Sequence, residues 1–71
     1  MINQETLKQY KDKVRDMHIL ELEELAAEAL YHLQVLVANS AIMSVYPNAE
    51  NFNKLNEVRQ EASEFFIQHQ V

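Results

Sequence analysis

The chain has 71 residues and a mass of 8.3 kDa, a size that accommodates one domain. Hydrophobic residues make up 48% and charged residues 24%, a balance typical of a folded chain. Cysteine and glycine are absent, which excludes a disulfide framework, cysteine-ligated zinc and the glycine-rich loops that bind phosphate. Eleven acidic residues against six basic ones give a formal net charge of −5.

The first predicted helix extends over about residues 3–16, with Asn3 as its N-cap. Its apolar positions recur at spacings of three and four, at Leu7, Tyr10, Val14 and Met17. A basic stripe lies beside them, at Lys8, Lys11 and Arg15. We expect a short connection near residues 17–21, because the apolar residues there break the preceding spacing. An uninterrupted helix through this segment is the alternative.

The second predicted helix extends over about residues 22–45 and ends before Pro47, which cannot continue a helix. It carries two apolar seams that point in roughly opposite directions, and this predicts two packing partners. The first seam consists of Leu22, Leu25, Ala29, Leu33, Leu36, Ser40 and Met43, thickened by Ala26, Leu30 and Val37. The second seam consists of Tyr31, Val35, Ala38, Ile42 and Val45.

The third predicted helix extends over about residues 48–69, with Asn48 as its N-cap and Glu50 in its first turn. Its apolar positions form one face, at Phe52, Leu55, Val58, Ala62, Phe65, Phe66 and His69. The predicted fold class is therefore all-α, a single helical domain over residues 1–71. A long antiparallel hairpin of the second and third helices is joined by the N-terminal helix.

The second seam is the predicted dimer or partner interface, because the first and third helices are expected to cover the first seam and no further helix remains for the second. Leaving its large side chains in water would forfeit about 1.5–3 kcal/mol each. A symmetric homodimer that completes a helical bundle is the commonest way to recover this free energy. A monomeric three-helix bundle, in which the first helix crosses the second seam, is the alternative.

The charge distribution favours a protein partner. Residues 21–47 carry four glutamates and no cation, and Glu21, Glu24 and Glu28 form an acidic surface suited to a basic protein. A net negative charge repels nucleic-acid phosphate. Contact with nucleic acid through the basic stripe is kept as an alternative.

One cluster has the residue types of a metal site. Glu24, Glu28 and His32 follow each other at spacings of four, and an antiparallel third helix would bring His69 near Glu24. A metal- or nucleotide-binding bundle that uses Glu24, Glu28 and His32 is thus the first alternative, ahead of nucleic-acid contact, since carboxylates and imidazole bind divalent ions. The pattern occurs once and lacks the repeated Glu-x-x-His of di-iron bundles, so we expect a solvated helix flank and no cofactor.

These observations predict a small non-enzymatic interaction module, a regulator or inhibitor of another protein. The three serines lie inside predicted helices, where no backbone amides are free to form an oxyanion hole. Residues 29–49 lack charged side chains but carry several polar ones, which disfavours a membrane span. The first residues do not resemble a secretory signal, and the cytoplasm is the default expectation.

Overall fold

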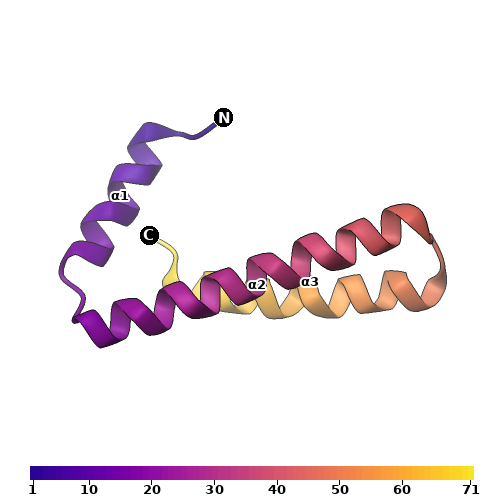
Figure 1. The fold of residues 1–71 in the computed structure, drawn as a ribbon. Coiled ribbons are helices and arrows are strands. Elements are labelled where there is room, and N and C mark those ends of the chain that lie inside the picture. Colours follow the sequence, from indigo (N-terminus) through magenta and orange to yellow (C-terminus); the bar gives the residue numbers. More distant parts are fainter.

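The computed structural model describes all 71 residues and contains three helices: α1 (Gln4–Arg15), α2 (Ile19–Val45) and α3 (Ala49–His69). In Figure 1, α2 and α3 lie side by side as a long antiparallel hairpin, and α1 leaves its open end at an angle. The predicted all-α class and the hairpin are confirmed. The chain is interrupted between α1 and α2, so the alternative of one continuous helix is wrong.

Asparagine side chains start two of the helices, at the positions that the sequence predicts. Asn3 Oδ1 accepts from the backbone N–H groups of Glu5 and Thr6, at 3.0 and 3.1 Å. Asn48 Oδ1 accepts from Asn51 N at 2.8 Å. The Asn51 side chain in turn donates to the Tyr46 carbonyl at 2.8 Å, which closes the turn around Pro47. Side-chain oxygens thereby satisfy N–H groups that the first turn of a helix leaves unpaired.

Replacing Asn48 with alanine should lower the free energy of unfolding by about 1 kcal/mol, because the Asn51 N–H loses its acceptor. Urea denaturation followed by circular dichroism, at a fixed protein concentration, measures the change. Asn53→Ala is the matched control, since Asn53 is an exposed residue of α3 whose side chain makes no hydrogen bond. An equal loss in both variants would contradict the capping role.

Helix α2 starts at Ile19, three residues earlier than the predicted start near Leu22. The cause is His18, whose backbone is extended and whose Nδ1 accepts from Leu20 N at 3.2 Å. Histidine is outside the usual set of N-cap residues, so no clear signal marks this helix start in the sequence. The extra turn brings Ile19 and Leu20 into the helix, and both are exposed.

The hydrophobic core is small and lies between α2 and α3. Only Leu55 and Val58 are buried, with 5% and 6% of their surface exposed. The side chains of α2 that face this core are half-buried: Leu25, His32, Val35, Leu36, Asn39 and Met43. A core of this size covers only a narrow stripe of α2.

Helix α1 covers neither seam of α2, contrary to the prediction. Its apolar residues Leu7, Tyr10 and Val14 are half-buried, and Lys13 Nζ donates to the His69 carbonyl at 2.6 Å. This hydrogen bond holds α1 at the open end of the hairpin, where a cation is favourable beside the C-terminus of α3. The monomeric bundle in which α1 crosses the second seam is also wrong, because exposed members of both seams remain along α2.

Candidate interaction surfaces

One side of the hairpin is a broad apolar surface that faces solvent. Leu30, Leu33 and Val37 of α2 are 66%, 56% and 61% exposed, although the first predicted seam contains all three. At 100° per residue these positions lie to one side of the line that packs on α3. Because the helices are antiparallel, the same side of α3 carries Phe52 and Phe66, which are also exposed. We call this surface the leucine face: Ile19, Leu22, Leu30, Leu33 and Val37 of α2 with Phe52 and Phe66 of α3.

The leucine face carries one carboxylate, that of Glu23 of α2, at its edge beside Ile19 and Leu30. The helical positions between its large residues are occupied mostly by small ones, namely Ala26, Ala29, Ser40 and Ser44 on α2 and Ser63 on α3. Arg59 is the one charged residue of α3 on this side, and it makes no ion pair. The result is a surface of large apolar residues and small residues with one cation, Arg59, and one carboxylate, Glu23.

The opposite side of the hairpin combines apolar and acidic residues, and we call it the mixed face: Tyr31, Ile42 and Val45 of α2 with Glu57, Glu61 and Glu64 of α3. Two open grooves run along it. Tyr31 lines one groove together with Glu61 and Glu64, and Ile42 lines the other together with Lys54 and Glu57. In the predicted second seam, Val35 is half-buried, whereas Tyr31, Ala38, Ile42 and Val45 are exposed.

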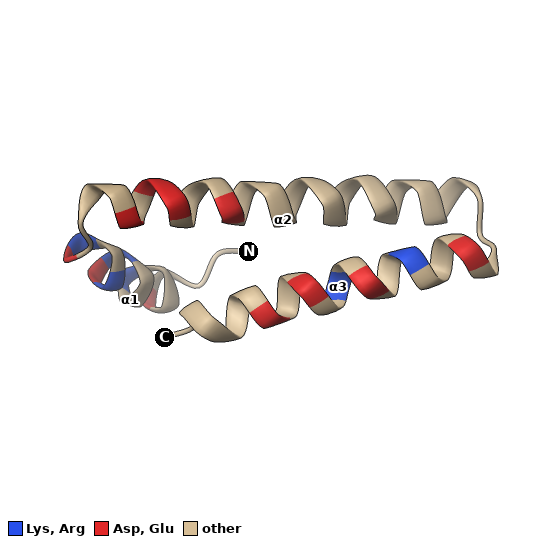
Figure 2. Ribbon diagram, turned by 90° about the horizontal axis from the view of Figure 1, so that it is seen from below, with Lys and Arg blue, Asp and Glu red and all other residues tan.

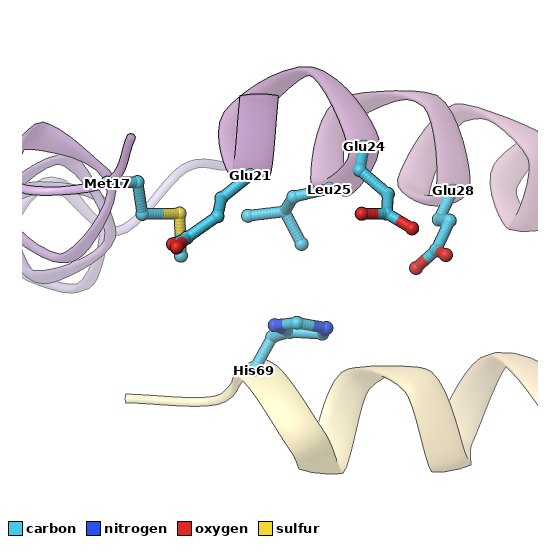
Figure 3. A pocket seen from close by; sticks show the side chains of 6 residues that line it. All are labelled: Met17, Glu21, Glu24, Leu25, Glu28 and His69. Carbon is cyan, nitrogen blue, oxygen red and sulfur yellow. The ribbon is translucent and has the colours of Figure 1, made fainter. Parts of the chain in front are cut away.

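The predicted acidic surface forms one wall of a third pocket, at the open end of the hairpin. Figure 3 shows Glu24 and Glu28 pointing from α2 toward the His69 ring at the end of α3. Glu21 lies beside Met17 at the edge of the same pocket. No lysine or arginine lines it. The predicted proximity of His69 to Glu24 is thus confirmed by their shared pocket.

His32 does not join these carboxylates and His69 in a metal site. Its ring packs on Phe65 at 4.8 Å between centroids, and Phe65 packs on His69 at 4.7 Å. Phe65 therefore stands between the two imidazoles. No group of three histidine, aspartate or glutamate side chains is arranged to hold a metal ion. His32 Nδ1 is shielded from solvent without a hydrogen-bond partner, so the ring contributes by packing.

The aromatic stack of Tyr31, His32, Phe65 and His69 was not predicted from the sequence. Tyr31 and His32 meet edge-on at 5.4 Å, and the other contacts continue the stack across the hairpin. Two features of the sequence could have predicted this stack. Phe65 and His69 are four residues apart on one face of α3, and an antiparallel register places Phe65 opposite His32.

The basic stripe of α1 is exposed and separate from the other surfaces. Lys8, Lys11 and Arg15 lie on the outer side of α1, and Figure 2 shows this helix crossing the open end with most of the cations. Arg15 pairs with Asp12 at 3.3 Å, an exposed contact that contributes about 0–1 kcal/mol. Part of this positive charge is therefore balanced within α1.

No helix of the chain has both the length and the apolar character that crossing a bilayer requires. The segment of α2 after Glu28 carries no charged side chain, as Figure 2 shows, but it includes polar residues such as Gln34 and Asn39. Comparison with protein-family models, with curated proteins and with solved structures finds no match to this chain.

Proposed function

We propose that the protein is a small non-enzymatic interaction module that regulates or inhibits another cytoplasmic protein through its mixed face. The supporting observation is the side-by-side placement of exposed Tyr31 and Ile42 with the carboxylates of α3 in two open grooves. Such a surface suits a partner segment with apolar side chains flanked by lysine or arginine. Apolar contacts supply affinity, and the carboxylates orient the partner and speed its association.

The acidic pocket extends this proposed surface toward the open end of the hairpin. Glu28 lines both the pocket with His69 and the groove with Tyr31. Glu21 and Glu24 continue the negative charge along α2. A basic segment can therefore follow carboxylates along the hairpin, while a net charge of −5 disfavours nucleic acid as the ligand.

The alternative functions have less support. Metal or nucleotide binding through Glu24, Glu28 and His32 would need these groups to converge, and Phe65 packs against His32 instead. Nucleic-acid contact would depend on Lys8, Lys11 and Arg15, three cations on one short helix of an acidic chain. Neither arrangement offers the combination of apolar and charged contacts that the mixed face does.

Affinity capture from a lysate of the source organism tests the proposal when wild-type chain is compared with two variants. Ile42→Asp places a charge in the mixed face, and we expect it to reduce the retained partner about 10-fold or more, since burying an isoleucine contributes about 1.5–3 kcal/mol. Gln34→Asp is the control, because it adds the same charge on the outer surface of α2. Quantitative mass spectrometry measures the retained proteins.

The proposal predicts a partner that is retained equally by the wild type and Gln34→Asp. Circular dichroism of each variant checks that the helices are intact. Capture of the same proteins by Ile42→Asp in equal amounts would show that the mixed face is not the binding surface. Absence of any protein retained above an empty matrix would count against an interaction module.

A further inference from the structure

We infer that a second copy of this chain covers the leucine face, so that two α2–α3 hairpins pack face to face as a four-helix bundle. The partner proposed for the mixed face binds on the opposite side of the hairpin. Self-association therefore uses large residues of the first seam of α2, which was expected to be covered within one chain. It does not use Tyr31, Ile42 and Val45 of the second seam.

The exposed area of the single chain is too large for a compact fold. A folded protein of this mass exposes about 4,600 Å². This chain exposes 5925 Å². The excess is larger than the roughly 800 Å² that each partner buries in a standard specific interface. The area that a stable dimer needs is thus available on one molecule.

The shape of the chain leads to the same conclusion. Its radius of gyration is 14.7 Å, whereas a compact domain of this length has a value of about 11 Å. The smallest dimension of the backbone is 16 Å, against 44 and 27 Å in the other directions. The hairpin is a single layer of helices, as Figure 1 shows, and a single layer encloses only the small core between its two helices. A second layer placed on the leucine face would enclose a larger one.

The distribution of charge selects a second copy as the occupant. Two chains that each carry a net charge of −5 repel, and they repel least where the contact surface holds few carboxylates. The leucine face has only Glu23 at its edge, whereas a dimer built on the mixed face would bring together Glu57, Glu61 and Glu64 of both copies. Arg59 is compatible with this contact, because its long stem lets the guanidinium reach solvent at the edge.

The order of large and small residues on the leucine face also suits a symmetric contact. Along α2, Leu30, Leu33 and Val37 form a block of large residues, with small residues before it (Ala26 and Ala29) and after it (Ser40 and Ser44). A symmetric contact places the same patch on both copies, so large residues of one chain can enter the spaces above small residues of the other. Antiparallel packing of two identical hairpins gives the short-loop, up-and-down geometry that four-helix bundles commonly have.

Light scattering coupled to size-exclusion chromatography tests this inference. We expect the wild type to have twice the 8.3 kDa chain mass, and Leu33→Glu to reduce the measured mass about twofold. Ile42→Glu is the matched control, because it adds the same charge on the other side of α2, and it should remain dimeric. A wild-type mass of one chain would overturn the inference, as would dissociation by Ile42→Glu but not by Leu33→Glu.

A second measurement covers the case in which Leu33→Glu fails to fold. The chain contains no cysteine, so Leu33→Cys and Ile42→Cys each introduce a single thiol. A short bis-maleimide reagent should join two Leu33→Cys chains covalently and leave Ile42→Cys chains without a covalent link. Efficient joining at position 42 alone would overturn the assignment of the surface. These results do not depend on capture of another protein, so failure of the proposed function is distinguishable from failure of self-association.

Discussion

Replacing Leu55 with alanine is expected to lower the free energy of unfolding by about 2–5 kcal/mol. Leu55 and Val58 are the only buried residues of the chain, and both come from α3. Removing the Leu55 side chain leaves a cavity where the two helices of the hairpin meet. A core in a chain of this size supplies only about 3–5 kcal/mol in total. The variant should therefore lose most of its helical circular dichroism signal at physiological temperature.

Urea denaturation provides the measurement, with Leu20→Ala as the matched control. The control removes the same atoms from a leucine of α2 that is exposed, so its cost should stay within about 0.5 kcal/mol. Equal destabilisation by the two substitutions would mean that Leu55 is no more important to the core than a surface leucine.

The melting temperature of the wild type is expected to rise by about 9 °C when the chain concentration is raised about 100-fold. If two chains fold and associate together, each tenfold increase in concentration adds about 1.4 kcal/mol to the stability of the assembled state. The isolated hairpin has only two buried residues, so its helices depend on the second layer for most of their stability.

Thermal melts followed by circular dichroism at several concentrations measure this dependence. Leu33→Glu should melt at a lower temperature than the wild type, and at one that does not change with concentration. A wild-type melting temperature that is constant over the whole range would mean that a single chain is stable without the proposed contact.

Local signals made most of the fold predictable. Pro47 ends α2, and the oxygens of Asn3 and Asn48 begin α1 and α3, because proline and asparagine act on the adjacent backbone and need no distant partner. The antiparallel hairpin follows from the short turn between the two long helices. The approach of His69 to Glu24 follows from the same register.

The features that sequence reasoning missed depend on contacts between distant segments. Both seams of α2 contain large apolar residues, so the spacing alone does not say where α3 packs. In the structure α3 lies between the two seams and leaves Leu33 exposed on one side and Ile42 on the other. The position of α1 is fixed by Lys13 and the His69 carbonyl, two groups 56 residues apart in the chain. No local pattern encodes that pair.

The same pair of groups has a consequence for the order of assembly. The contact between Lys13 and the His69 carbonyl is the one side-chain hydrogen bond that joins α1 to the rest of the chain. The His69 carbonyl reaches its position only after the last turn of α3 has formed and α3 has packed against α2. Closing a long loop costs entropy before the contact repays it. We therefore expect folding to proceed from the Pro47 turn outward, with the amino-terminal helix as the last part to dock and the first to detach.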